Sequence, residues 1–350
     1  MKKFVFRCDG ANLPEIGTGH VVRDVAIAKR LVETGLCQSG EVSFVMRVGG
    51  SFRLGRDLVA DAGFKIEDAA DRELAWNSSS EAKILKKSLP TVLVVDRLST
   101  ESSWMRSLKT SVRNIITMDD LGDGAPLATI TVNAILYGDS ANSNCLTGYD
   151  YLALKPMPKL PTKIKAREVK SIVASFGGYD HRNLAGFFLS SLYSFESNLL
   201  AGLSIEVLVG KESEARTDSW VELAERTSSL HDCNIRLLIQ SENFAQHLAK
   251  ADLAILSGGL TIFDALSLGI PSIGIPQYDH QLATLQRLFG QRAVLIGSIG
   301  MRLDERRFVE VLIDAIGDQG VRMALSKRGP ALVDRKGIDR IVALLSDFIS

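Results

Sequence analysis

The chain has 350 residues, with 41 basic and 41 acidic side chains and a formal net charge of zero. Its length is about twice that of a usual domain and predicts two domains, each large enough to bury its own core. The balanced charge gives no electrostatic reason to expect nucleic acid or an anionic membrane surface as a partner.

Cysteine spacing and the apolar runs predict a cytoplasmic protein. The four cysteines are scattered, without a metal-binding spacing, and we expect free thiols in a reducing compartment. Arg7 and Asp9 interrupt the first apolar run too early for a signal peptide. No apolar stretch is long enough to span a bilayer, so no transmembrane segment is expected.

The first part of the chain alternates between strand and helix patterns. Strands are expected at 4–8, 42–46, 64–66, 91–95, 114–118 and 129–134, with Cys8 inside the first and 129–134 as the last of this half. Helices are expected at 20–34, 54–62, 82–87 and 104–110. This alternation predicts a parallel sheet with helices on both faces.

A proline-rich stretch then interrupts the pattern, and we place the interdomain linker at 155–165. The alternation restarts with strands expected at 171–176, 204–209, 235–239, 253–256, 272–275 and 293–296. Helices are expected at 184–195, 218–228, 244–250, 281–289, 305–315, 321–327 and 338–348. The fold class is therefore α/β with two Rossmann-like domains, 1–154 and 155–350, and the last helix is a candidate to pack back on the first domain.

A glycine turn in the second half follows the apolar run 253–256 and leads into a helix. It reads Ser257-Gly258-Gly259-Leu260-Thr261-Ile262-Phe263-Asp264. Free backbone N–H groups and the positive end of a helix dipole suit a phosphate or diphosphate. Glycines allow close approach, and Asp264 could accept hydrogen bonds from a sugar diol. The alternative is a capping box, with Thr261 as N-cap and Asp264 at the third helical position.

A second glycine loop follows the first strand and reads Ile16-Gly17-Thr18-Gly19-His20. It lacks the third glycine of a dinucleotide-binding fingerprint and the lysine of a phosphate-binding loop. Ligands of open parallel sheets bind beyond the carboxyl ends of the strands, which makes His20 a candidate general base. The alternative is a tight turn that carries an exposed histidine.

Two further loops lie at strand ends in the second half. Gly177-Gly178-Tyr179-Asp180 could contact phosphate, or it could be an ordinary turn with Asp180 as a helix cap. In Asp279-His280-Gln281, the glutamine could bind sugar hydroxyls, or Asp279 could be a helix N-cap.

Three aspartates also follow strands in the first half. Asp96 and the pair Asp119-Asp120 could bind a metal ion, but carboxylates at such positions more often cap loops. We therefore predict no metal site and no cofactor.

These motifs, in this order, resemble the UDP-sugar hydrolase family of pseudaminic acid synthesis and the spore-coat polysaccharide proteins that are similar to it. The resemblance extends from Phe4 to about Gly297, and its first segment runs from Phe6 through Gly17-Thr18-Gly19-His20 to Asp24. Met118-Asp119-Asp120, Phe176 to Asp180, and Ser257 to Gln281 carry the rest. More distantly, the chain resembles the peptidoglycan N-acetylglucosaminyltransferase. These relatives imply the GT-B architecture, two Rossmann-like domains with parallel sheets facing a central cleft.

The resemblance also implies roles for individual residues. His20 would be the catalytic histidine that activates water for attack at the anomeric carbon, with UDP leaving. The UDP-binding residues would be Gly177, Gly178, Ser257, Gly258, Gly259, Leu260, Thr261 and Asp264. The sugar-binding residues would be Gly17, Thr18, Gly19, Asp96, His280 and Gln281.

The sequence departs from the family pattern at three of these places. Asp264 stands where a glutamate is usual, and His280 replaces the asparagine of an Asn-Gln pair. The stretch Asp96-Arg97-Leu98 lacks the tyrosine that the hydrolase carries near the reacting sugar.

Three functions follow from these observations. The leading hypothesis is hydrolysis of a UDP-linked amino-deoxy sugar in nonulosonate or surface-glycan synthesis. The alternatives are a glycosyltransferase that uses the same donor and a nucleotide-sugar binding protein without turnover.

Overall fold

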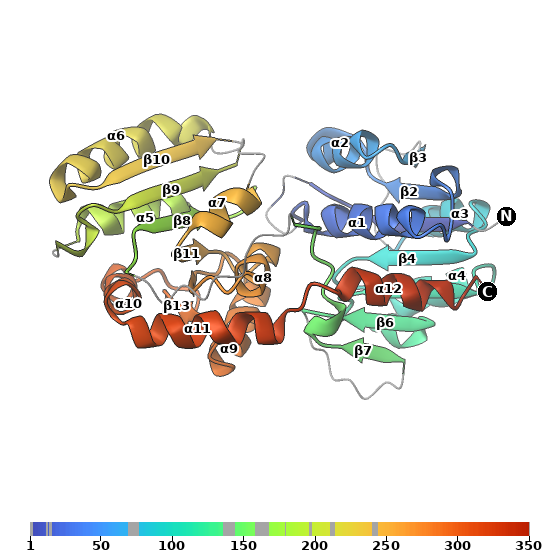
Figure 1. Ribbon diagram of the computed structural model, residues 1–350. Helices are drawn as coiled ribbons and strands as arrows, with labels where there is room; N and C mark the ends of the chain where they lie inside the picture. Colours follow the sequence, from blue (N-terminus) through green and yellow to red (C-terminus); the bar gives the residue numbers. More distant parts are fainter. Residues whose placement is uncertain are drawn as a thin grey trace. The chain divides into compact units, whose positions relative to one another are not determined.

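The computed structural model describes residues 3–11, 13, 16–68, 77–135, 144–157, 168–178, 180–195, 198–210, 214–239 and 244–349. It divides into two compact units (Figure 1). Unit 1 comprises residues 1–156 and 335–350, and unit 2 comprises residues 157–334. Within the described ranges, no helix is long and apolar enough to cross a membrane.

Unit 1 is built on a parallel sheet of seven strands in the order β3-β2-β1-β4-β5-β6-β7. The strands are β1 (Phe4–Cys8), β2 (Val42–Met46), β3 (Lys65–Asp68), β4 (Val92–Asp96), β5 (Asn114–Met118), β6 (Ile130–Asn133) and β7 (Cys145–Thr147). The helices are α1 (Gly19–Glu33), α2 (Arg53–Asp61), α3 (Ser79–Lys87), α4 (Ser102–Lys109) and α12 (Gly337–Ser346). Short 3₁₀ turns are η1 (Ser39–Glu41), η2 (Gly50–Phe52), η3 (Ala125–Leu127) and η4 (Tyr149–Tyr151).

Alternation along the strands separates two cores in unit 1. Phe4 and Phe6 pack in one cluster with residues of α1 and α12, whereas Val5 packs in the other with residues of α3 and α4. Successive strand side chains point to opposite faces, so the helices cover both faces of the sheet.

Unit 2 repeats this arrangement with six parallel strands in the order β10-β9-β8-β11-β12-β13. The strands are β8 (Ser171–Ser175), β9 (Ser204–Val209), β10 (Asn234–Ile239), β11 (Leu253–Leu256), β12 (Ser272–Gly274) and β13 (Leu295–Ile296). The helices are α5 (Leu184–Tyr193), α6 (Glu214–His231), α7 (Phe244–Lys250), α8 (Leu260–Ser267), α9 (Asp279–Gly290), α10 (Glu305–Gly317) and α11 (Gln319–Leu332), and η5 (Asn198–Leu200) is a 3₁₀ turn. The predicted fold class, two parallel-sheet α/β domains, is confirmed.

One strand prediction was wrong. The strand expected at 129–134 does not close the first sheet, because β7 follows it and pairs with β6 through Thr131 and Cys145. β7 has only three half-buried residues, too few to show a strand periodicity in the sequence. Only residues 155–157 of the expected linker lie within the described ranges.

The last helix belongs to unit 1, whereas the expected second domain extended to residue 350. Arg340 donates from Nη1 to the carbonyl of Asp150 at 2.9 Å, and Arg30 of α1 donates to Asp339 at 2.7 Å. Gly337 lies so close to the backbone of Leu152 that an added Cβ would be 2.2 Å from its carbonyl oxygen. The start of α12 therefore packs against the backbone of Leu152 in a close contact that only glycine permits.

We predict that Gly337→Ala destabilises unit 1 by about 1–3 kcal/mol, because the new methyl group overlaps backbone that cannot move aside cheaply. Gly317→Ala at the end of α10 is the matched control, since a Cβ there meets no heavy atom within 4 Å. Urea unfolding of both variants measures the difference. Equal stability of the two variants would contradict the contact.

Candidate functional site

The His20 cluster lies at the carboxyl edge of the sheet in unit 1. We use this name for His20, Arg23, Asp24, Asp96 and Asp119. Nδ1 of His20 lies 2.5 Å from Oδ1 of Asp96, and Arg23 contacts both oxygens of the same carboxylate. A further N–H of Arg23 donates to Asp119. The side chain of His20 is 21% exposed, whereas that of Asp96 is fully buried.

The charges around Asp96 determine which ring nitrogen of His20 carries the proton. Burial alone would raise the pKa of Asp96, but Arg23 and then His20 hold that pKa well below its usual range. The carboxylate is therefore ionised and accepts the Nδ1–H of His20. In the neutral imidazole with this tautomer, Nε2 carries the lone pair, which is the arrangement of a histidine general base.

Asp96 has protein partners in this geometry, and its predicted contact with a sugar stays a prediction. The sequence placed it among sugar-binding residues, and its hydrogen-bond partners here are His20 and Arg23. Gly17, Thr18 and Gly19 form the turn before His20, and α1 begins at Gly19 without a side-chain cap from Thr18.

Asp119 and Asp120 serve the loop-capping alternative rather than the metal alternative. Asp119 binds Arg23 through one oxygen and accepts the backbone N–H of Ile135 at 2.9 Å through the other. Asp120 accepts from the N–H and hydroxyl of Thr100 and from the N–H of Gly122. All four carboxylate oxygens have protein donors in this arrangement.

The glycine turn of unit 2 ends in an uncapped helix. α8 begins at Leu260 with Gly259 as N-cap, no side chain caps it, and its first turn holds no acidic residue. The capping-box alternative is therefore wrong, because Thr261 lies inside the helix and Asp264 lies beyond its first turn. The first N–H groups of α8 and its positive dipole end remain suited to an anion.

Close packing against α9 explains one of the two glycines. An added Cβ on Gly258 would lie 2.7 Å from the carbonyl oxygen of Gln281, whereas one on Gly259 would find Nε2 of Gln281 at 3.7 Å. Oε1 of Gln281 accepts the backbone N–H of Gln277 at 2.9 Å. That bond fixes the amide group of Gln281 with its Nε2 beside the glycine turn.

The loop after β8 combines a helix cap with a turn that favours glycine. Both oxygens of Asp180 accept N–H groups at the start of α5, from Leu184 and Ala185 at 2.8 Å. The side chain of Asp180 therefore caps α5, as the capping alternative predicts, although Asn183 is the N-cap residue. Gly177 has a positive φ of 84°, which favours glycine, and Tyr179 lies outside the described residues.

The loop after β12 presents aromatic rings. Tyr278, not Asp279, is the N-cap of α9, so the capping alternative for Asp279 is wrong by one residue. The rings of Tyr278 and His280 stack with centroids 5.4 Å apart. The ring of His181 also stacks on Tyr278, with centroids 4.9 Å apart. Gln277 donates to the carbonyl of Phe176 and thereby ties this loop to the one after β8.

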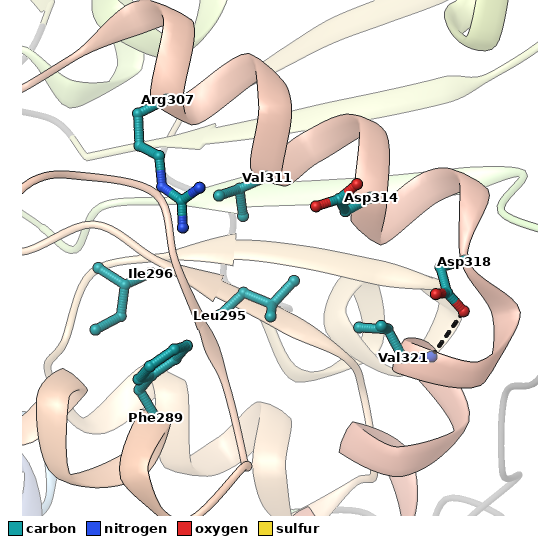
Figure 2. A pocket seen from close by; sticks show the side chains of 8 residues that line it. All are labelled: Phe289, Leu295, Ile296, Arg307, Val311, Asp314, Asp318 and Val321. Atoms are coloured by element: carbon teal, nitrogen blue, oxygen red, sulfur yellow. Dashed lines mark hydrogen bonds between the residues drawn. The ribbon is translucent and has the colours of Figure 1, made fainter.

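A separate cavity in unit 2 contains none of the predicted site residues. Its volume is about 240 Å³, and Figure 2 shows Leu295 and Ile296 of β13 among its lining side chains. Asp318, also in the lining, accepts the backbone N–H of Val321 at 3.0 Å and caps α11. Asp318 therefore acts as a helix cap, and we assign this cavity no substrate.

Sequence reasoning missed three partners of the predicted site. Arg23 and Asp24 follow His20 by three and four positions, and Cys8 pairs in register with Asp96 in the sheet. Residues at such spacings share one face of a helix, and this signal could have identified Arg23 and Asp24.

Comparison with known proteins supports the fold and a distant relationship. No protein-family model matches the chain. The spore coat polysaccharide biosynthesis protein SpsG of Bacillus subtilis is 24% identical over 344 residues, which is 95% of each chain. The chain is thus a distant homologue of that protein.

Solved structures share the architecture. MurG of Acinetobacter baumannii superposes with a TM-score of 0.69 at 15% identity over 99% of both chains. A UDP complex of S. aureus MnaA gives 0.64 at 14% identity over 100% of this chain and 97% of that one. The spinosyn rhamnosyltransferase SpnG gives 0.59 at 16% identity over 98% and 100%. The fold is GT-B.

A second buried ion network yields a prediction for acid stability. Asp9 pairs with Arg7 and Arg47, and these cations outweigh burial and lower its pKa to about 2. A depressed carboxyl pKa stabilises the fold above about pH 4 and loses that effect as the pH falls toward 2. Asp9→Asn should cost about 2 kcal/mol at pH 7. Urea unfolding between pH 7 and pH 2 tests this prediction, with Asp57→Asn at an exposed aspartate as the control. A loss of stability in Asp9→Asn that does not change with pH would contradict it.

The uncapped start of α8 yields a prediction for anion binding. A Cβ added at Gly259 would make only an ordinary contact, with Nε2 of Gln281 at 3.7 Å. A larger side chain would crowd the first N–H groups of α8. We therefore expect Gly259→Val to weaken UDP binding by on the order of tenfold without unfolding the protein. Gly290→Ala, at a glycine with open space around it, is the control. Calorimetric titration with UDP measures both, and unchanged affinity in the first variant would contradict an anion site there.

Proposed function

We propose that the protein hydrolyses a UDP-linked sugar at its anomeric carbon and releases UDP and the free sugar. The observation that carries the proposal is the pairing of His20 with Asp96, which leaves Nε2 as the free base of a half-buried histidine. Unit 2 supplies the second requirement, an uncapped helix start for a diphosphate.

The proposed reaction is a single displacement. Nε2 of His20 takes a proton from water as the water oxygen attacks the anomeric carbon, and the bond from that carbon to the diphosphate oxygen breaks. The electron pair leaves with UDP. Asp96 stabilises the imidazolium that forms, because it is an ionised acceptor on the other ring nitrogen. A displacement of this kind inverts the anomeric configuration.

The roles in unit 2 concern the leaving group. The backbone of Ser257, Gly258 and Gly259 and the first turn of α8 would hold the diphosphate, where fixed donors stabilise the charge that develops on it. Asp264 would accept from the ribose hydroxyls, Gly177 and Gly178 would approach a phosphate, and Gln281 and His280 would contact the sugar. The UDP bound to MnaA supports this assignment of the nucleotide.

The class of sugar rests on the relatives. The resemblance to the hydrolase of pseudaminic acid synthesis favours an amino-deoxy sugar, and the distant homology to a spore coat polysaccharide biosynthesis protein favours polysaccharide synthesis. We therefore propose a role in the synthesis of a nonulosonate or a surface glycan.

A glycosyltransferase is the second candidate, and the stretch after β4 favours it. Arg97 is buried, binds Glu81 and lies over the ring of Trp104, and Leu98 stands where the hydrolase carries its tyrosine. SpnG, a rhamnosyltransferase, shares the fold. In that case an acceptor hydroxyl replaces water, and His20 remains the base.

We predict that His20→Ala abolishes turnover and retains UDP binding, because the base and the diphosphate site belong to different units. The measurement is NMR of wild type and variant with a panel of UDP-sugars and no acceptor, with His231→Ala as a control histidine. Free sugar and UDP from wild type and the control alone support hydrolysis, and the first anomer reports inversion.

Two other outcomes decide against hydrolysis. Intact UDP-sugar that binds wild type excludes water as the nucleophile and favours the transferase, which a panel of acceptors then tests. Tight binding without turnover under every condition, with His20→Ala unchanged, favours a binding protein instead.

A further inference from the structure

Asp24 of α1 is a buried carboxyl group that the proposed reaction does not use. It is fully buried, and neither of its oxygens has a hydrogen bond of good geometry among the described residues, where the thiol of Cys8 and the carboxylate of Asp96 interact with it. An unpaired polar group in such a place costs free energy, so it calls for a functional explanation.

Two neighbours from the sheet act on this carboxyl group. The thiol of Cys8 and the carboxylate of Asp96 both interact with Asp24, and they stand side by side because β1 and β4 pair Cys8 with Asp96. Burial, and then the negative charge of Asp96, raise the pKa of Asp24 well above its ordinary value. Asp24 therefore keeps its proton where an exposed aspartate has lost it.

Arg23, which precedes Asp24 in the chain, acts to lower the pKa of Asp24, but less strongly than burial and Asp96 raise it. Its N–H groups donate to Asp96 and Asp119, and Asp24 is not among its hydrogen-bond partners. The charged and titratable groups that act on Asp24 are Arg23 on α1, Cys8 on β1 and Asp96 on β4. His20 and Asp119 belong to the same network through Asp96 and Arg23.

The charge of the His20 cluster depends on this proton. With Asp24 protonated, two carboxylates face one guanidinium, and the cluster becomes neutral when His20 accepts a proton. With Asp24 ionised, a third carboxylate would stand beside Asp96 in a buried site and compete for Arg23. Like charges so placed disfavour each other strongly.

We infer that Asp24 is a positioning residue for the His20–Asp96 pair, that it works as a neutral carboxylic acid, and that its ionisation sets an alkaline limit on activity. The inference rests on the proposed role of His20 as base. Asp24 touches no reacting atom in this scheme, and it acts through Asp96.

Variants at this position separate the neutral form from the charged one. Asp24→Asn mimics the neutral acid and cannot ionise. It should have a higher kcat than Asp24→Leu near pH 6.5 and retain its activity at alkaline pH, where wild type declines. Asp24→Leu, which removes the polar group, should lower kcat by on the order of tenfold and leave KM nearly unchanged.

Stability gives a readout that does not depend on activity. A raised carboxyl pKa means that the folded state must hold a proton that the unfolded chain has lost above about pH 4, so this cost grows as pH rises from there. Asp24→Asn removes the cost. It should have a higher Tm than wild type at pH 8, and the gain should shrink toward pH 5. Asp61→Asn, at an exposed aspartate, is the control and should show no such gain.

Cys8 is the other group that could cause an alkaline decline. Burial first, and then Asp24, raise the pKa of its thiol. Cys8→Ala should keep the alkaline limit if Asp24 causes it and lose the limit if the thiol does. This variant therefore assigns the titrating group.

The outcomes are distinct for the two levels of inference. Loss of kcat at every pH in Asp24→Asn, or an alkaline decline that this variant shares with wild type, would overturn the inference. If Asp24→Asn does not fold, an infrared band of a protonated carboxyl in wild type at neutral pH, shifted in Cys8→Ala, supports the neutral acid, and its absence overturns it. If wild type cleaves no sugar nucleotide, the proposed function fails, and the Tm and infrared results still decide the state of Asp24.

Discussion

The guanidinium of Arg23 is the contact on which the candidate site in unit 1 depends. It joins α1 to the ends of β4 and β5, because it binds Asp96 and Asp119 together. These are buried groups, and without the cation two carboxylates would be left uncompensated in the interior. The same cation keeps Asp96 ionised, so one ion pair both fixes the helix and sets the tautomer of His20.

In unit 2 the candidate anion site consists of backbone N–H groups rather than side chains. Its glycine turn brings α9 against Gly258 and leaves the start of α8 without a cap. Side chains that could have competed with a ligand are occupied elsewhere, as with Asp180 at the start of α5. Because α5 is capped and α8 is not, we expect an anion at the start of α8 rather than at the start of α5.

Much of this architecture could be predicted from the sequence, because the strands are apolar and short helices alternate with them. β7 could not, since three half-buried residues carry no periodicity and the strand is defined by its pairing with β6. In the site, glycine loops after strands predict where a ligand would bind, and this stays a prediction. Partner choice could not be predicted, because Asp96 binds His20 across 76 positions of sequence, and only the order of the strands brings them together.

The return of the chain to unit 1 at residue 335 has a consequence for biosynthesis. Unit 2 is an insertion between two segments of unit 1. During synthesis from the N-terminus, unit 2 is complete before α12 is made, whereas the core cluster of unit 1 that includes Ile341 and Leu345 must wait for α12. Unit 1 is thus the first to begin folding and the last to finish, and a chain that stops before α12 leaves the His20 helix with part of its apolar face uncovered.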